Sequence, residues 1–204
     1  MSINIDDINS NILDVLKEIG NIGSGNAATA LANMISKRVN MDVPQTRLLE
    51  FKDVSNLLGG EENPVVGIYF EMKGDVVGNI MFVLDLNSAK NLTEMLYSHD
   101  TDSDDLTEMD ISALSEIGNI ISSSYVNSLS ELTGLKIKIS VPSLSIDMAG
   151  AILSVPAIQF GHIGDHVLFV ETKFEEGKRE VIGNLFLIPE IQSFTKILNG
   201  LGVL

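Results

Sequence analysis

The sequence Glu-Ile-Gly-Asn-Ile occurs twice in this chain, at residues 18–22 and at residues 116–120. The two copies lie 98 residues apart, and the same offset relates Pro44 to Pro142. The pattern of apolar residues around each copy also repeats, since a helical period is followed by strand-like stretches and a final helix. This repeat constrains the chain to fold as two copies of one unit, related by a pseudo-two-fold axis.

Each copy is predicted to contain helices and strands in the same order. We predict the α/β class, with both repeats in one two-layer domain whose long helices pack on a largely antiparallel sheet. The repeats are assigned to residues 1–98 and 107–204, and an acidic linker at residues 98–107 joins them. The predicted elements are a helix at 8–35 (continuous, or bent at 20–25), a strand at 38–43, a hairpin at 64–84, a helix at 88–97, a helix at 108–133, a strand at 135–141, a hairpin at 166–188 and a helix at 190–200.

The second long helix carries a signal at each of its ends. Thr107 is the predicted N-cap, and Asp110 stands three residues later as its capping-box partner. Gly134 follows the last turn of the apolar pattern and is predicted to stop the helix.

The acidic linker has an alternative interpretation as a calcium site. Asp100, Asp102 and Asp104 have the spacing of the first three ligands of an EF-hand loop. The later positions do not fit, because the loop requires Gly where Asp105 stands and Glu where Ile111 stands. We therefore favour a solvated linker.

The bulk composition argues against several classes of function. The net charge of −15 opposes binding to nucleic acids and to anionic membranes. Cysteine is absent, which excludes disulfides and thiolate chemistry and fits a cytoplasmic protein. The acidic start is not a signal peptide and no long apolar run occurs, so we expect no membrane insertion. His99, His162 and His166 do not recur in both copies, and we predict no metal site.

The two repeated helices each carry a polar pair beside their apolar stripe. Glu18 and Asn21 are three residues apart, and Glu116 and Asn119 have the same spacing. Residues three apart lie on one face of a helix. Asn is a poor helix former, so its presence in the middle of both helices favours a function over an ordinary solvated face.

The glycines next to these pairs suggest a surface that another protein can approach. Gly20 and Gly118 are predicted to leave the helix bare beside the polar side chains. A small polar residue, Asp14 or Ser112, stands four residues before each Glu and is predicted to share its face. The pattern therefore favours a docking surface for a second protein.

The segment Gly-Asn-Ile-Gly-Ser-Gly-Asn at residues 20–26 could instead cradle a phosphate group. It follows a helix rather than a strand, however, and lacks the Lys and the Ser or Thr of a P-loop. The second copy replaces Gly23 by Ile121 and Gly25 by Ser123, so the glycines do not repeat. The Glu and the Asn do repeat, and an Asn amide can position a water molecule. Phosphoryl transfer requires mainly placement and charge neutralisation, which points to a phosphorylated partner protein that brings its own metal.

These residues resemble the signature of the CheC/CheX/FliY family of phosphatases, over essentially the whole chain. The chain contains two such arrangements, Asp14-x-x-x-Glu18-x-x-Asn21 followed by Pro44, and Ser112-x-x-x-Glu116-x-x-Asn119 followed by Pro142. Members of the family act on the phosphorylated chemotaxis response regulator CheY. Because both signatures are complete, the chain is most similar to the CheC type, whereas CheX-type members have one active copy.

The resemblance implies a role for each residue of the two pairs. Asn21 and Asn119 would each orient a water molecule for attack on the aspartyl phosphate, and Glu18 and Glu116 would pair with a Lys of the regulator. The Mg²⁺ would belong to the regulator, so no cofactor of the chain's own is expected. Since Ile121 stands where the first copy has Gly23, the second site is expected to be bulkier.

The resemblance also implies a second partner, the receptor deamidase CheD. The family contact lies on a short helix after the second Pro, which here is residues 145–151 with Ile146, Asp147 and Met148. The alternative for this segment is an ordinary buried helix capped by Asp147. The alternative for the whole protein is a noncatalytic adaptor that binds phosphorylated CheY and CheD.

Overall fold

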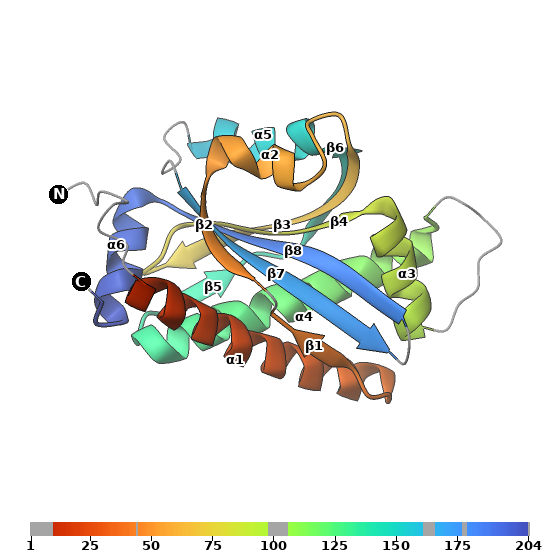
Figure 1. The fold of residues 1–204 in the computed structure, drawn as a ribbon, viewed down its shortest axis with the longest axis horizontal. Helices are drawn as coiled ribbons and strands as arrows, with labels where there is room; N and C mark the ends of the chain where they lie inside the picture. The colour runs from red at the N-terminus through yellow and green to blue at the C-terminus, as the bar shows by residue number, and fades with distance from the viewer. Residues whose placement is uncertain (1–9, 44, 98–105, 161–165, 177–178, 204) are drawn as a thin grey trace.

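A single antiparallel sheet with helices on its faces forms the centre of the molecule (Figure 1). The computed structural model describes residues 10–43, 45–97, 106–160, 166–176 and 179–203. The elements are α1 (Ser10–Ile35), β1 (Asn40–Asp42), β2 (Thr46–Glu50), α2 (Val54–Leu57), β3 (Pro64–Gly74), β4 (Gly78–Asp85), α3 (Leu86–Tyr97), α4 (Glu108–Thr133), β5 (Ile137–Ile139), β6 (Ser143–Met148), α5 (Ala149–Phe160), β7 (His166–Glu176), β8 (Arg179–Pro189) and α6 (Ile191–Gly200).

The same order of elements runs through the chain twice. A long helix, two short strands, a short helix, a two-stranded hairpin and a further helix make up α1 to α3, and α4 to α6 repeat this series. The strand order is β1-β7-β8-β4-β3-β5, with β2 also paired to β7 and β6 also paired to β3. The equivalent strands β4 and β8 therefore lie side by side at the centre, and each repeat's short strands pair with the other repeat's hairpin.

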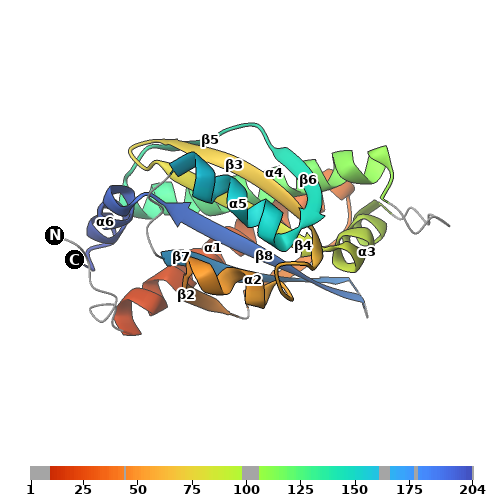
Figure 2. The ribbon, with the colours of Figure 1, turned by 90° about the horizontal axis from the view of Figure 1, so that it is seen from above.

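The predicted α/β architecture, with long helices on an antiparallel sheet, is confirmed. Helices α1 and α4 lie beside one another on one face of the sheet, and α3 and α6 pack against the same core (Figure 1). The short helices α2 and α5 cover the other face and enclose a second, smaller core (Figure 2). These two helices add a layer that the sequence did not predict. Because both faces are covered, β4 is buried from Gly78 to Leu84.

The ends of α4 are those predicted from the sequence. The backbone amide of Asp110 donates to the Thr107 hydroxyl at 3.2 Å, and the Thr107 amide donates to the Asp110 carboxylate at 2.9 Å. Gly134 adopts a left-handed conformation with φ 71° directly after the last helical residue. The positions of the two repeats as residues 1–98 and 107–204 stay a prediction. Residues 98–105, which include the three Asp of the calcium alternative, lie outside the described residues.

Two predictions of secondary structure need correction. The helix predicted at residues 145–151 is wrong, because Ser143–Met148 forms strand β6 and α5 begins only at Ala149. Strand β6 pairs antiparallel with β3, from Ser143 opposite Tyr69 to Met148 opposite Pro64. The sequence also did not predict β2 and α2. Residues 20–26 lie within the continuous helix α1, so they do not form a phosphate-binding loop.

Candidate functional site

The two predicted Glu–Asn pairs lie at the surface of neighbouring helices. Glu18 and Asn21 are exposed on α1, Glu116 is exposed on α4, and Asn119 is half-buried. In the part of the chain that the structure describes, none of these four side chains forms a hydrogen bond or an ion pair with another residue. Their amide and carboxylate groups are thus available to a second molecule.

The residues that accompany each pair are only partly described. Asp14 and Ser112 are both exposed, and the Ser112 hydroxyl donates to the carbonyl of Glu108 within α4 at 3.0 Å. Pro142 is half-buried between β5 and β6, whereas Pro44 lies outside the described residues. The Ser112 hydroxyl therefore donates its proton within its own helix, whereas the Glu and the Asn of each pair have no partner among the described residues.

The glycines beside the pairs face inward, which contradicts the predicted bare surface. Gly20 is buried, and a Cβ atom on it would lie 3.3 Å from Cγ1 of Val43. Gly118 is also buried, and a Cβ atom on it would lie 2.8 Å from Cδ1 of Ile68 on β3. These two glycines allow the helices to pack close to the sheet beneath them. A partner protein would therefore contact the opposite, outward side of each helix.

Gly23 allows α1 and α4 to touch. A Cβ atom at this position would lie 2.9 Å from Cδ1 of Tyr125, closer than real Cβ atoms approach, and 3.1 Å from its Cα. Its counterpart Ile121 is 0% exposed. The difference between Gly23 and Ile121 therefore lies on the buried faces of the helices, and the expectation that Ile121 adds bulk to the second site is wrong.

The two helices are anchored differently behind their polar pairs. The Ser24 hydroxyl donates to the carbonyl of Met41 at 2.9 Å, which ties α1 to β1. Its counterpart on α4, Ser122, is also fully buried, but its hydroxyl has no hydrogen-bond partner among the described residues. The Ser24 hydroxyl thus joins the turn after the first pair to the sheet, whereas the Ser122 hydroxyl makes no such bond within the described residues.

Tyr125 is a buried residue of this region that sequence reasoning missed. Burial raises the pKa of its hydroxyl to about 12, and the nearby hydroxyls of Thr172 and Ser24 offset part of that rise. The Tyr125 hydroxyl nevertheless makes no hydrogen bond of normal geometry within the described ranges. One signal was present in the sequence. At the 98-residue offset Tyr125 corresponds to Ala27, so the second repeat has a large residue where the first has a small one, as at Ile121 and Gly23.

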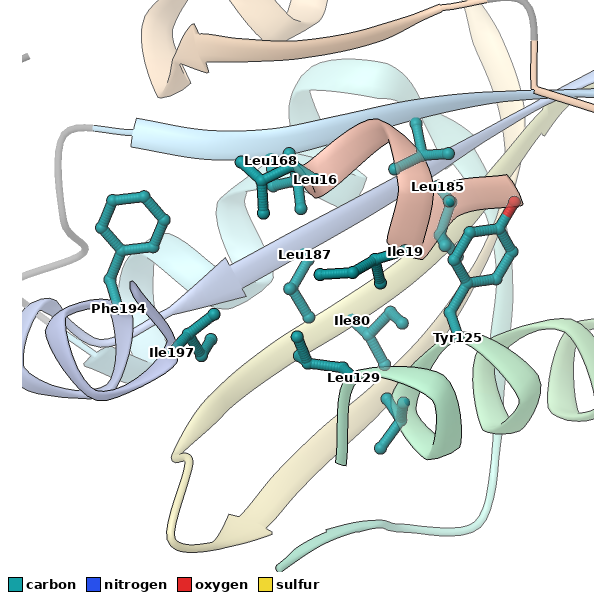
Figure 3. A pocket seen from close by; sticks show the side chains of 13 residues that line it. Leu16, Ile19, Ile80, Tyr125, Leu129, Leu168, Leu185, Leu187, Phe194 and Ile197 are labelled. Carbon is teal, nitrogen blue, oxygen red and sulfur yellow. The ribbon is translucent and has the colours of Figure 1, made fainter. Parts of the chain in front are cut away.

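An apolar cavity of about 30 Å³ lies on the inner side of α1, next to Tyr125 (Figure 3). Side chains of α1, α4, α6 and the central strands enclose it. They include Leu16, Ile19, Tyr125, Leu129, Leu187 and Ile197. The cavity faces the core and not the exposed pair, so we do not assign it to the candidate site.

The residues predicted to contact the deamidase lie on β6. Ile146 and Met148 are 43% and 54% exposed, and they stand two residues apart on one face of the strand. Asp147 between them is also exposed, and its carboxylate accepts a hydrogen bond from the Met148 amide at 2.8 Å. These residues form an exposed strand and not the buried helix of the alternative interpretation.

The described residues contain neither a candidate membrane-spanning helix nor a candidate metal site. No helix there is both long and apolar enough to span a lipid bilayer. No group of three or more His, Asp or Glu side chains is placed there to hold a metal ion.

Comparison with known proteins returns a consistent group of relatives. A model of the CheC-like family matches residues 12–47 and 109–146, which contain both Glu–Asn pairs. The CheY-P phosphatase CheC of Bacillus subtilis (strain 168) is 35% identical over 195 residues, which cover 93% of this chain and 93% of that protein. The crystal structure of Thermotoga maritima FliY is 25% identical with a TM-score of 0.74, covering 99% of this chain and 98% of that one. A chain of the CheX–CheY–BeF3–Mg²⁺ complex from Borrelia burgdorferi shares the fold, with a TM-score of 0.51 at 20% identity over 82% of this chain and 96% of that one.

Proposed function

The chain belongs to the CheC-like family, and from this we propose that it hydrolyses the aspartyl phosphate of the phosphorylated chemotaxis response regulator CheY. The observation that carries the proposal is the two Glu–Asn pairs at the surface of adjacent helices, with Glu18, Asn21 and Glu116 exposed and Asn119 half-buried, and with no partner among the described residues. The 35% identity to a CheY-P phosphatase over nearly the whole of both chains supports it.

In this proposal Asn21 and Asn119 act on water. The side-chain carbonyl of each Asn accepts a hydrogen bond from a water molecule and holds its oxygen in line with the acyl phosphate. The water oxygen forms a bond to phosphorus while the bond between phosphorus and the aspartyl oxygen breaks. The products are the regulator's free carboxylate and inorganic phosphate, which takes up the protons of the water.

Glu18 and Glu116 serve docking in this proposal. Each lies one helical turn from its Asn, with about 5–6 Å between Cβ atoms, so one regulator can meet both side chains at once. Their exposed carboxylates would pair with a Lys of the regulator, and this contact fixes the angle at which the Asn enters. A charged pair that loses water on docking gives orientation as well as affinity.

The divalent cation belongs to the regulator in this proposal, and we place the reaction in the cytoplasm. Mg²⁺ on the regulator neutralises charge on the phosphoryl oxygens, which leaves placement of the water to this protein. The absence of cysteine from the sequence is consistent with a reducing compartment.

A second proposed partner is the deamidase CheD, at strand β6. Ile146 and Met148 are the exposed apolar residues of this strand, and Val155 of α5 is a further one at 46% exposure. Exposed apolar side chains gathered on one element favour a protein contact over plain solvent. This contact involves other residues than the Glu–Asn pairs, so it can be tested separately.

The test is a dephosphorylation assay with purified regulator labelled by acetyl phosphate. We expect the protein to speed the loss of the phosphoryl group catalytically, and the double substitution Asn21→Ala and Asn119→Ala to abolish this effect while binding persists. Full activity in the double variant would exclude these residues as the catalysts. Binding of phosphorylated regulator without any turnover by the native protein would favour the adaptor function instead.

A further inference from the structure

The two Glu–Asn pairs rest on different buried supports, although both consist of the same two residue types. Behind the first pair, α1 contacts Tyr125 at Gly23 and is tied to β1 through Ser24. At the corresponding positions the second repeat has Ile121 and Ser122, whose hydroxyl has no hydrogen-bond partner among the residues that the structure describes. The large side chain at this crossing thus comes from the second repeat and packs on the first.

We propose that Tyr125 is a positioning residue for the first site, Glu18 and Asn21, and does not serve the second site, Glu116 and Asn119. The inference rests on the proposed function, because it assigns a supporting residue to one of the two sites. Tyr125 does not itself reach a substrate, since it is 5% exposed.

The position of the ring on α1 supports this assignment. Gly23 follows Asn21 by two residues, a rise of about 3 Å along a helix, and its backbone lies directly against the Tyr125 ring. On α4, Tyr125 stands six residues beyond Asn119, a rise of about 9 Å. A change in the ring therefore acts next to the first Asn and more than a helical turn away from the second.

The cavity beside Tyr125 leaves α1 with fewer packing contacts on its inner side, so the contact with the Tyr125 ring contributes more to holding this helix. Leu16, Ile19 and Gly20 of α1 border a space of about 30 Å³ that no side chain fills (Figure 3). Atoms that face such a space lose dispersion contacts on that side. The ring of Tyr125 closes one side of this space and thereby limits the freedom of the turn that carries Asn21.

The ring and not the hydroxyl provides the support. The hydroxyl has no hydrogen bond of normal geometry in the described part of the chain, as is also true of Thr172 close to it. Tyr125→Phe keeps the whole ring. Tyr125→Leu keeps counterparts of the Cγ and Cδ1 atoms that meet Gly23 but removes the rest of the ring, and Tyr125 is one of the residues that line the cavity. These two substitutions separate a packing role from a polar one.

The repeat supplies internally controlled backgrounds for the experiment. Asn119→Ala leaves the first site alone active, and Asn21→Ala leaves the second alone active. Tyr125→Leu and Tyr125→Phe are added to each, and kcat and KM are measured on acetyl-phosphate-labelled regulator. We expect Tyr125→Leu to lower kcat about tenfold in the first-site background, because a misplaced catalytic group costs rate steeply. We expect less than about a twofold change in the second-site background, and Tyr125→Phe to keep full activity in both.

An equal loss of kcat in both backgrounds would overturn the assignment, since a general loss of stability affects both sites. Hydrogen exchange gives an answer that does not depend on activity. In Tyr125→Leu we expect faster exchange at the amides of residues 18–24 and unchanged exchange at residues 116–122. Faster exchange in both segments, or in neither, would contradict the assignment. This measurement remains valid if both single-site backgrounds prove inactive, and that inactivity would separately refute the proposed function.

Discussion

The hydroxyl of Ser24 donates a hydrogen bond to the carbonyl of Met41 at 2.9 Å, three residues beyond Asn21 on α1. Both residues are buried, and the bond joins α1 to the sheet across 17 residues of chain. The corresponding Ser122 is equally buried but has no such partner in the described ranges. This contrast lets one repeat serve as the control for the other.

Ser24→Ala is expected to destabilise the protein by about 1–2 kcal/mol, since it removes a buried hydrogen bond and leaves an acceptor without its donor. Ser122→Ala is the matched control. It removes a buried hydroxyl that has no hydrogen-bond partner within the described ranges, so its effect is expected to be near zero or stabilising. Urea unfolding of both variants measures the difference, and a larger loss for Ser122→Ala would contradict the structure.

Gly23→Ala and Gly25→Ala are expected to have opposite effects on stability. A Cβ atom at Gly23 meets the Tyr125 ring at 2.9 Å, so the first change is expected to cost about 1–3 kcal/mol through overpacking. Gly25 has open space around it, and Ala there is expected to stabilise α1 by about 0.5–1 kcal/mol. Thermal unfolding gives the comparison, and two changes of the same sign would mean that the helices do not meet at Gly23.

The stability of the native protein is expected to fall between about pH 10 and pH 12 because of Tyr125. Its folded pKa is raised to about 12 from an ordinary 10.0, so burial favours the neutral phenol. The contribution is fully present below pH 10 and is lost as the pH rises toward 12, with a slope of about 1.4 kcal/mol per pH unit at most. Tyr125→Phe cannot ionise and is expected to lack this loss. Unfolding curves for both proteins across this range measure it, and parallel curves would show that Tyr125 titrates normally.

Asn21→Ala and Asn119→Ala are each expected to lower the rate of dephosphorylation, and the double variant to lose at least about a hundredfold. In the proposed mechanism the Asn amide orients the attacking water, so kcat is expected to change more than the affinity for the phosphorylated regulator. Glu18→Ala with Glu116→Ala is expected to reduce both. Steady-state kinetics together with a direct binding measurement separate the two cases, and a pure loss of affinity in the Asn variants would argue for docking alone.

Ile146→Glu with Met148→Glu is expected to abolish binding of CheD and to leave the phosphatase rate within about twofold. A carboxylate in place of each exposed apolar side chain removes apolar contact area and adds a desolvation cost. Ile182→Glu is the control, because Ile182 is a comparably exposed residue on β8, at 40%. Co-purification or calorimetry with CheD gives the measurement. Equal binding by all three proteins would remove β6 from the proposed contact.

The sequence predicted the elements that depend on residues close together in the chain. Helix α4 begins at the Thr107 capping box and ends at Gly134 as predicted, because both signals act within one turn. Likewise, the spacing of three between Glu18 and Asn21 sufficed to place both on one exposed face, since helix geometry fixes which residues are neighbours. The duplication itself was visible in the 98-residue offset.

Tertiary contacts decided what the sequence could not. The inward orientation of Gly20 and Gly118 depends on the residues of the sheet beneath them, which the local sequence does not specify. The segment after Pro142 forms strand β6 because it pairs with the edge of β3. The contact of Gly23 with Tyr125 joins residues about a hundred positions apart. Local propensity carries no information about such partners, because the energy of close packing arises only when distant surfaces meet. The sequence by itself thus determined which helices would carry the polar pairs, and the packing of one repeat on the other determined how each pair is held.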